Sequence, residues 1–268
     1  RTFLLETFQG RRAKSEHLDG RFYYPRLGIG MIAEKLAASC GADRVRLNAR
    51  VTGLRHDGRR VNAVEVNGSE VIPADRVICT LPLPLTAKLL SPALPAPVLE
   101  EIAALRFRHV VLVGLFLRRA SATHVGSVYF PDAGFPMTRV YEPRNRSAEM
   151  APPGHTMLVA EIPCDAADAV WQQPDDEIVR VVADKLGACG WFRADEITGG
   201  CVKRLPAAYP VLAAGVQKRV RRVMDALSVF DNLSILGRNG EFRYTHLHDL
   251  LRFGHDVISA LPATRGVS

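Results

Sequence analysis

Two turn dipeptides constrain the first part of this 268-residue chain more than any other feature. Asp57-Gly58 and Asn67-Gly68 are each flanked by short runs of alternating apolar and polar residues. Asx-Gly dipeptides favour the tight turns that join antiparallel strands, because these turns need positive φ angles. The pattern predicts a β-meander, with strands at residues 45–47 continuing at 51–55, then at 61–66 and 71–72, and a further buried strand at 76–81.

The composition is that of a folded soluble protein. Hydrophobic residues make up 47% of the chain, and 35 Lys and Arg against 28 Asp and Glu give a net charge of +7. This balance excludes a disordered, collagen-like or disulfide-dense chain. The longest apolar run, residues 110–117, is interrupted by Gly114 and falls short of the ~18 residues that a membrane span needs. We therefore expect no membrane span.

The cysteines favour a reducing, cytoplasmic setting. Their number is odd, and no two form a C-x-x-C pair, so neither a disulfide framework nor a zinc site is indicated. They are Cys40, Cys79, Cys164, Cys189 and Cys201.

Basic clusters at residues 59–60, 118–119 and 218–222 raise the question of nucleic-acid binding. Residues 216–227, however, carry an apolar stripe between the basic positions, as a solvated amphipathic helix does. Aromatic residues do not interleave with the clusters, as a single-strand binder would require. We expect no nucleic-acid partner.

The remaining periodicities predict a mixed α/β fold with an antiparallel sheet in the middle of the chain. Seven prolines between Pro82 and Pro136 mark a change of composition. Predicted helices cover residues 29–39, 98–105, 175–189, 216–227 and 247–261. Predicted strands cover residues 109–117, 127–130, 137–141, 156–162, 202–205 and 233–236.

A first glycine motif, Gly-Ile-Gly-Met-Ile-Ala at residues 28–33, matches the dinucleotide fingerprint G-x-G-x-x-G/A. That fingerprint follows a buried strand, whereas Tyr24, Pro25 and Arg26 precede this motif. Asn48 stands about where the acid that binds ribose is expected. We interpret the motif as a loop-to-helix turn that does not bind pyrophosphate.

A second glycine turn, Leu-Gly-Arg-Asn-Gly at residues 236–240, lies between a short apolar strand and a long apolar helix. Glycine amides there can approach a phosphate, and Arg238 can add positive charge. Asn-Gly is also a common dipeptide in plain hairpin turns. Spacing alone leaves both interpretations open.

No side-chain catalytic constellation is evident. His246, His248 and Asp249 resemble metal ligands, but histidines at i and i+2 diverge on a helix, and no third ligand cluster appears. Polar residues in the first turn of a helix are the favoured interpretation. Because no nucleophile elbow or P-loop is present, a bound cofactor is the more reasonable source of chemistry.

The ordered set of motifs resembles the flavin amine oxidase and protoporphyrinogen oxidase superfamily of FAD-dependent oxidoreductases, in particular its UDP-galactopyranose mutase-like branch. The motifs are Phe-Tyr-Tyr-Pro-Arg-Leu-Gly-Ile-Gly at 22–30, Val-Arg-Leu-Asn-Ala-Arg-Val at 45–51, Ala-Asp-Arg-Val-Ile-Cys-Thr-Leu-Pro at 74–82 and Leu-Gly-Arg-Asn-Gly-Glu-Phe-Arg-Tyr at 236–244. The resemblance implies a two-domain, Rossmann-like FAD-binding fold with an inserted antiparallel-sheet substrate domain.

The resemblance also implies a domain assignment. Residues 21–85 and 206–268 would belong to the FAD domain, 86–205 to the substrate domain, and 1–20 to a connector or the stump of a missing segment. The family's N-terminal dinucleotide fingerprint would precede Arg1, so the chain would be the C-terminal portion of a longer flavoprotein.

Few individual residues carry over from the family. Val51 matches the position whose backbone contacts adenine, and Gly237, Arg238, Asn239 and Gly240 match the second FAD motif near the pyrophosphate and ribityl chain. His248 lies where many relatives have an Asp close to the flavin, and Tyr-Thr-His-Leu-His-Asp at 244–249 departs from the usual string. The resemblance implies FAD as cofactor and a small-molecule substrate, and it assigns no catalytic residue.

Three functions stay open at this stage. The first is oxidation of an amine, a porphyrinogen-like ring or a saturated chain by FAD. The second is a mutase-like rearrangement of a sugar nucleotide on reduced flavin. The third is a flavin-free binding or scaffold module. The sequence does not indicate the oligomeric state.

Overall fold

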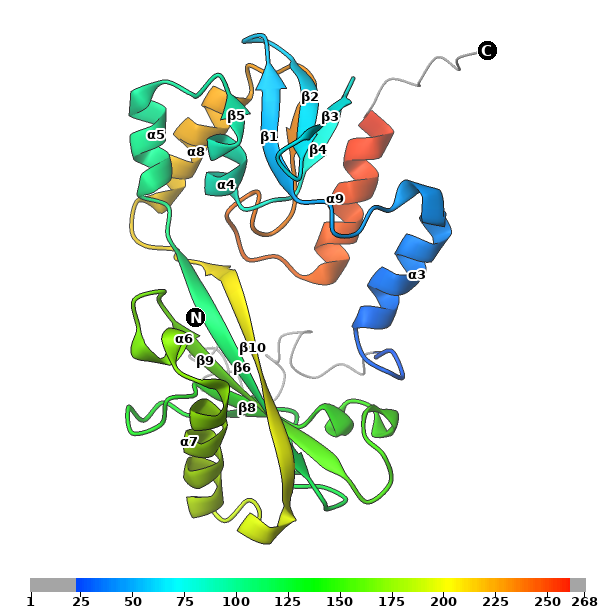
Figure 1. Cartoon of the computed structure of the whole chain (residues 1–268), viewed down its shortest axis with the longest axis vertical. Helices are drawn as coiled ribbons and strands as arrows, with labels where there is room; N and C mark the ends of the chain where they lie inside the picture. Colours follow the sequence, from blue (N-terminus) through cyan, green and yellow to red (C-terminus); the bar gives the residue numbers. More distant parts are fainter. Residues whose placement is uncertain (1–22, 261–268) are drawn as a thin grey trace, which may run out of the picture.

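A computed structural model describes residues 23–260. The predicted connector at residues 1–20 and the end of the last predicted segment, 261–268, lie outside the described residues. The described chain builds a lower part around one long antiparallel sheet and an upper part of small sheets and helices (Figure 1). The strands β6 and β10 run between the two parts (Figure 1).

The predicted meander is present in the upper part. The strands β1 (Val51–His56), β2 (Val61–Val66) and β3 (Glu70–Pro73) pair antiparallel through the two Asx-Gly turns. The short strand β5 (Leu90–Ser91) adds to β1 in parallel. The prediction of a strand at residues 45–47 is wrong. A 3₁₀ turn, η2 (Ala42–Arg44), precedes it, and Leu47 is 82% exposed, so no neighbour supports a strand there.

A second small sheet consists of two parallel strands, β4 (Val77–Cys79) and β11 (Leu233–Ile235). Asn232, which is 2% exposed, ties this sheet to the meander. Its side chain accepts a hydrogen bond from the Val61 amide (2.8 Å) and donates to the carbonyls of Val61 (2.8 Å) and Asp75 (2.9 Å). One buried amide side chain therefore holds three segments in register.

The helices α4 (Leu83–Lys88), α5 (Ala96–Ala103) and α8 (Val216–Leu227) enclose the upper core. The apolar stripe predicted for α8 is confirmed, since Val216, Val220, Val223 and Leu227 are buried. Helix α4 is absent from the predictions, in which the prolines from Pro82 onward mark only a change of composition. Proline is favoured in a first helical turn, where its missing N–H has no intrahelical partner to lose.

The lower part is a five-stranded antiparallel sheet in the order β10-β6-β9-β8-β7. Its strands are β6 (Phe107–Leu117), β7 (Val128–Tyr129), β8 (Arg139–Tyr141), β9 (Thr156–Cys164) and β10 (Ile197–Pro210). Helix α7 (Asp175–Ala188) covers one face through Ile178, Val182 and Leu186, and α6 (Ala169–Gln172) precedes it. The strand predicted at residues 202–205 is much longer than expected, because Gly199 and Gly200 pair with β6 and the pairing resumes at Tyr209 after Pro206.

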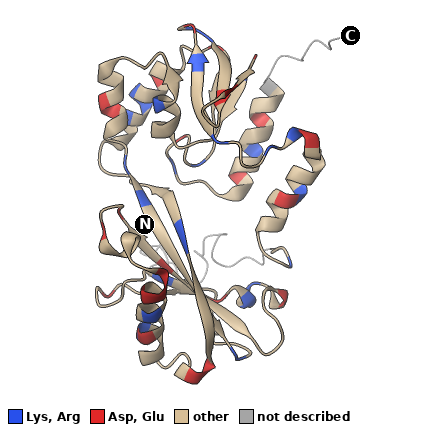
Figure 2. Ribbon diagram, in the orientation of Figure 1, with Lys and Arg blue, Asp and Glu red and all other residues tan. Residues whose placement is uncertain are grey.

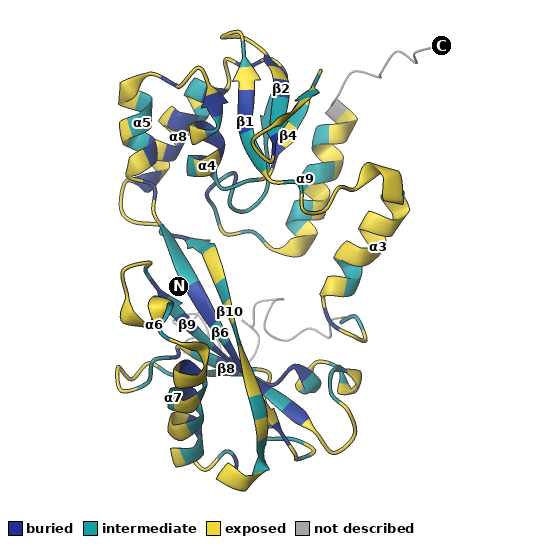
Figure 3. Cartoon of the chain, viewed as in Figure 1, coloured by how far each residue is buried: buried dark blue, intermediate teal, exposed yellow. Residues whose placement is uncertain are grey.

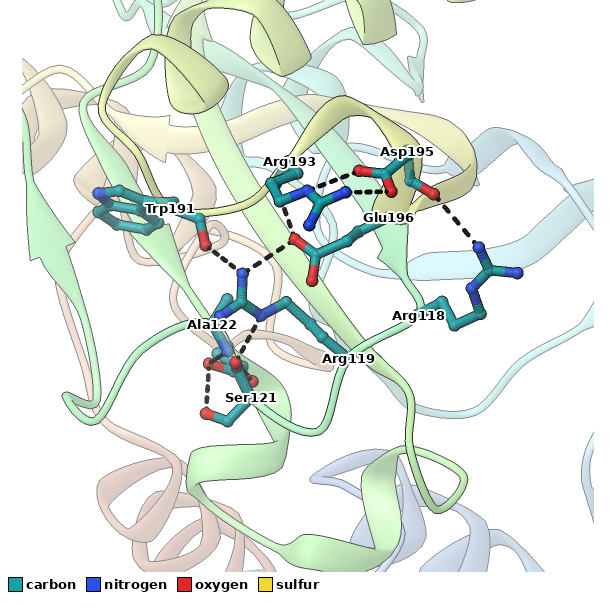
Figure 4. Close-up of polar contacts among 9 residues, drawn as sticks. Arg118, Arg119, Ser121, Ala122, Trp191, Arg193, Asp195 and Glu196 are labelled. Atoms are coloured by element: carbon teal, nitrogen blue, oxygen red, sulfur yellow. Dashed lines mark hydrogen bonds and ion pairs between the residues drawn. The ribbon is translucent and has the colours of Figure 1, made fainter.

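Single 3₁₀ turns and one buried carboxylate support the loops of the lower part. The turns are η3 (Pro143–Asn145), η4 (Ala148–Met150) and η5 (Ala194–Glu196). At the far end of the sheet, Arg119 donates to the carbonyl of Trp191 (2.8 Å) and to Glu196 (3.1 Å) (Figure 4). Glu142 is fully buried and accepts hydrogen bonds from the backbone amides of Ala122 (3.1 Å) and Thr123 (2.7 Å).

Two helices at the side of the upper part remain largely exposed (Figure 3). They are α3 (Gly30–Cys40), which contains no buried residue, and α9 (Leu247–Ala260). Ile29 and Leu36 are 53% and 48% exposed, so the apolar positions predicted for the first helix are not part of the core. No helix within residues 23–260 is long and apolar enough to cross a membrane.

Basic and acidic positions are interspersed over the elements (Figure 2), and at least one arginine of each basic cluster pairs with a carboxylate. Arg219 bonds Glu101 of α5 at 2.6 Å, and Arg222 bonds the same carboxylate. Arg59 pairs with Asp231 at 2.7 Å. These arginines therefore serve contacts between elements.

Candidate functional site

The carboxyl ends of β4 and β11 form the base of the candidate site. Leu233 lies beside Val77 and Ile235 beside Cys79, and the Leu236 amide extends the pairing with a 2.9 Å bond to the Cys79 carbonyl. Ligands of α/β proteins bind where parallel strands end, because the loops that follow the strands present free backbone groups there. The second glycine turn starts at this point.

The turn after β11 is fixed by the backbone. Gly237 has φ +87°, a conformation that a side chain disfavours. A Cβ on Gly240 would lie 2.2 Å from the Leu236 carbonyl oxygen, so this glycine permits close backbone packing. The carbonyl of Asn239 accepts a bond from the Leu83 amide at the start of α4 (3.0 Å). The turn is thus a rigid link between β11 and α4.

A cavity of about 470 Å³ opens beside this turn, and we call it the loop pocket. Its lining comes from the ends of β4, β10 and β11 and from one side of α9. The lining residues are Thr80, Ala208, Leu236, Gly237, Arg238, Asn239, Leu250, Phe253 and Gly254.

Buried side-chain polar atoms without a partner are concentrated next to the loop pocket. Within residues 23–260 these atoms are Arg238 Nε, Asn239 Oδ1, Arg243 Nε and Thr245 Oγ1. Native proteins pair nearly all buried polar groups, so such a cluster marks a place where a ligand supplies partners. Arg238 and Asn239 both line the loop pocket. The donors and the acceptor offered there suit a polar, phosphate-bearing or hydroxyl-bearing ligand.

Arg238 packs against two neighbouring aromatic rings, whose centres are 6.2 Å apart. Its guanidinium carbon is 5.0 Å from the ring centre of Tyr209 and 4.9 Å from that of Tyr244. Such stacking holds a cation without neutralising its charge. Burial raises the pKa of the Tyr209 phenol above its usual value, so this side chain is uncharged at neutral pH. The side chain of Arg238 forms none of the salt bridges within residues 23–260.

Val51 lies in a different hollow, of about 360 Å³, lined by residues 49–52 with Leu81, Leu85 and Leu89. Thr80 lines the loop pocket, and the next residue, Leu81, lines this hollow. The two cavities therefore flank the chain segment that leaves β4. The structure brings Val51 and the second glycine turn to opposite sides of this segment.

His248 is placed away from the loop pocket. Its side chain is 70% exposed, its ring stacks on His246 with centroids 5.6 Å apart, and it lies 3.7 Å from Asp249. Helix α9 presents Leu250, Phe253 and Gly254 to the pocket instead. Among the residues that the structure describes, no group of three His, Cys, Asp or Glu side chains could hold a metal ion.

The first glycine motif sits in an unpaired turn. Residues 23–27, the described residues before it, contain no strand, Gly28 has φ +106°, and the amide of Gly28 bonds the Pro25 carbonyl at 3.0 Å. The amides of Met31 and Ile32 bond the carbonyls of residues 28 and 29. These occupied amides support the interpretation of the motif as a loop-to-helix turn.

Comparison with known proteins identifies the family of this chain. A model of flavin containing amine oxidoreductases matches residues 7–223. The chain belongs to this family. The match ends before the second glycine turn, so the assignment of that turn depends on geometry. No protein of curated function matches the sequence.

Solved structures of flavin amine oxidase relatives share the fold. A reduced UDP-galactopyranose mutase matches with a TM-score of 0.69 and 16% identity over 82% of this chain and 48% of its own. A putative protoporphyrinogen oxidase from Exiguobacterium sp. 255-15 gives 0.64 and 20% over 79% and 46%. Putrescine oxidase bound to putrescine gives 0.58 and 18% over 87% and 53%. The chain thus spans about half the length of each.

Several lining residues escaped the sequence analysis. Thr80 follows β4, and Ala208 lies in β10. Only the pairing of these strands with their neighbours brings the two residues to the loop pocket. Phe253 lies in the long apolar helix predicted at residues 247–261, where no local signal distinguishes it from a core residue.

Proposed function

We propose that this chain forms part of an FAD-dependent oxidoreductase and that the loop pocket holds the phosphate and ribityl portion of FAD. The observation that carries the proposal is the cluster of buried, unpartnered polar atoms on residues 238–245. A phosphate and a polyol chain offer acceptors and hydroxyl donors, which are the partners that Arg238 Nε and Asn239 Oδ1 lack.

Each residue has a distinct task in this proposal. The backbone of Gly237 approaches the ligand because no Cβ intervenes, and Arg238 supplies the positive charge that a pyrophosphate needs. Val51 and its apolar hollow would receive the adenine ring. FAD bound here would supply the ability to accept a hydride, and the protein would orient the ring and exclude water.

A sugar-nucleotide mutase is the second candidate. The TM-score of 0.69 to a reduced UDP-galactopyranose mutase favours it as a specific observation. Both candidates require bound flavin, whereas a flavin-free binding module does not. Substrate consumption with net flavin reduction would separate the oxidoreductase from the mutase.

Flavin loading tests the proposal directly. The purified chain is incubated with FAD, freed of excess by gel filtration and scanned for the flavin absorption bands. We expect a coloured protein, and we expect Arg238→Ala to lose flavin while Arg193→Ala retains it. Arg193 is a matched control because it is exposed and paired with Asp195 at the far end of the sheet (Figure 4). A chain that stays colourless with added FAD would overturn the proposal.

A further inference from the structure

A second cavity, of about 340 Å³, lies on the face of the five-stranded sheet that α7 leaves open, and we call it the sheet pocket. Its lining residues are Arg108, Tyr129, Thr138, Arg139, Glu161, Pro163, Tyr209 and Tyr244. Tyr209 and Tyr244, whose ring centres are 6.2 Å apart, both contact Arg238, which lines the loop pocket. The two pockets therefore adjoin where these tyrosines meet Arg238.

The only carboxylate in the lining of the sheet pocket is already engaged. Glu161 on β9 lies directly opposite Arg139 on β8. Arg139 Nε donates to Glu161 Oε2 at 3.0 Å, and its Nη2 donates to the other carboxylate oxygen. The Glu161 side chain is only 12% exposed, so its charge is neutralised at short range and held from water. An ammonium ligand would have to displace Arg139 to reach it.

The rest of the lining is rich in hydrogen-bond donors. The hydroxyls of Thr138 and of the three tyrosines can all donate, and the guanidinium of Arg108 adds further N–H groups. Arg108 Nη1 donates a hydrogen bond to Asp165 Oδ2 at 2.7 Å, and Asp165 does not line the pocket. These groups suit a ligand that carries acceptors and negative charge.

One arginine without a carboxylate partner within residues 23–260 adjoins the sheet pocket. Arg238 contacts Tyr209 and Tyr244 of the lining through its guanidinium. Its uncompensated charge favours an anionic ligand over a cationic one. The exposed faces of Tyr129 and Tyr244, 69% and 54% exposed, offer flat surfaces for an apolar ring.

We propose that the sheet pocket binds an organic anion with a planar apolar body, and that this molecule is the substrate. The anionic group would contact Arg108 and Arg139, and the ring would lie on the tyrosines. The substrate role rests on the proposed flavin function, because only a flavin in the adjoining pocket makes the bound molecule a reactant. The binding itself depends on this chain's residues alone.

Two matched probes test the charge preference. Phenylacetate and benzylamine carry the same ring and opposite charges, and each is titrated into the chain by calorimetry, with and without FAD. We expect phenylacetate to bind at least tenfold more tightly than benzylamine and to weaken as salt is added, because ionic contacts are screened. Equal or tighter binding of benzylamine would overturn the proposal.

Three variants locate the binding. Glu161→Gln frees Arg139 from its partner, so phenylacetate should bind several-fold more tightly. Tyr209→Phe keeps the ring and removes one donor, so phenylacetate should bind several-fold more weakly. Glu100→Gln, the same charge change at an exposed position of α5 outside the pocket lining, should change nothing. Phenylacetate affinity that is the same in all three would place the anion elsewhere and contradict the proposal.

The outcomes separate this inference from the proposed function. A chain that binds FAD but not phenylacetate would overturn the anion pocket alone. A chain that binds phenylacetate with the expected variant pattern but never takes up FAD would overturn the flavin function and the substrate role, and would leave the anion site standing. Thermal melting of Glu161→Gln shows whether that variant is folded, and Tyr209→Phe supplies the test if it is not.

Discussion

The side chain of Asn239 donates a hydrogen bond of 2.9 Å to the backbone carbonyl of Ala207. This bond joins the turn after β11 to a bulge in β10, where Leu205 pairs with Val110 but Tyr209 pairs with Arg108. Ala207 has φ +51°, and its amide donates to His109 Nδ1 at 3.0 Å. The strained bulge is thus held on both sides, and it carries Ala208 into the loop pocket.

Asn239→Ala should destabilise the protein by about 1–3 kcal/mol, the cost of leaving a half-buried carbonyl without its donor. The measurement is the free energy of unfolding in urea. Gln217→Ala on the exposed side of α8 is the control and should stay within about 0.5 kcal/mol of wild type. Equal effects of the two changes would mean that the Asn239–Ala207 bond does not stabilise the bulge.

Arg238→Ala should lower FAD affinity about tenfold and leave the melting temperature nearly unchanged, because the side chain contributes a charge and no core packing. Flavin-to-protein ratio and melting temperature are measured on the same samples. The difference in FAD affinity between wild type and Arg238→Ala should shrink at high salt, which screens the ionic contact that Arg238 makes. Unchanged flavin loading would exclude Arg238 from the cofactor site.

Substitutions of the two glycines of the turn should have effects that differ from those of Arg238→Ala and from each other. Gly240→Ala places a Cβ 2.2 Å from the Leu236 carbonyl, so we expect loss of folded protein. Gly237→Ala must adopt φ +87°, at a cost of about 1 kcal/mol, and its Cβ would lie 3.6 Å from Thr80 Cβ. Circular dichroism and flavin content distinguish the two. A stable Gly240→Ala would contradict the close packing.

Local signals in the sequence predicted the meander and helix α8 well, since Asx-Gly turns and an apolar stripe act over a few residues. They failed where partners lie far along the chain. A proline such as Pro206 ordinarily ends a strand that is predicted from the sequence. The strand β10 nevertheless continues past it, because β6 pairs with β10 on both sides of the bulge. Residues 236–240 were recognised as a possible site, but strand pairing alone brought Thr80 and Ala208 to it.

The sheet pocket could not be predicted for the same reason. Arg108, Arg139, Glu161 and Tyr209 stand on four different strands and meet only through register. His248 is a different case. The family resemblance assigned it by its position in the chain, and the structure places its side chain, 70% exposed, outside the lining of the loop pocket.

Glu101→Gln should remove a pH-dependent contribution to stability. Hydrogen bonding from Arg222, together with the charge of Arg219, holds the pKa of Glu101 below its ordinary value. A carboxyl whose folded pKa is depressed stabilises the fold above its unfolded pKa, about 4.3, and this contribution is lost as pH falls through the folded pKa.

The melting temperatures of wild type and Glu101→Gln should therefore differ at pH 7 and converge in acid. Glu100→Gln on the same helix, at an exposed position, is the matched control. A difference between wild type and Glu101→Gln that stays constant down to acid pH would show that the packing of Glu101, not its charge, links α5 to α8.

Glu142→Gln should destabilise the lower part by about 2–3 kcal/mol. The carboxylate accepts from the Ala122 and Thr123 amides and from Thr156 Oγ1 (2.5 Å), whereas an amide would turn an N–H group toward donors. Urea unfolding measures the loss. The exposed Glu149→Gln serves as the comparison, and a similar small effect in both would mean that the buried site tolerates an amide.

The pairing of β6 with β10 has a consequence for how the chain closes on itself. Phe107 and Pro210 are neighbours in the sheet, so the long segment between them begins and ends at one place. Once that sheet has formed, bringing Leu233 beside Val77 requires closing only two short segments, residues 78–106 and 211–232. The entropic cost of closing a loop grows with the number of its residues that are still free to move. Insertions and deletions between β6 and β10 therefore add nothing to the entropy of assembling the two parallel strands. The lower part is free to diverge in length among relatives while the turn after β11 keeps its geometry.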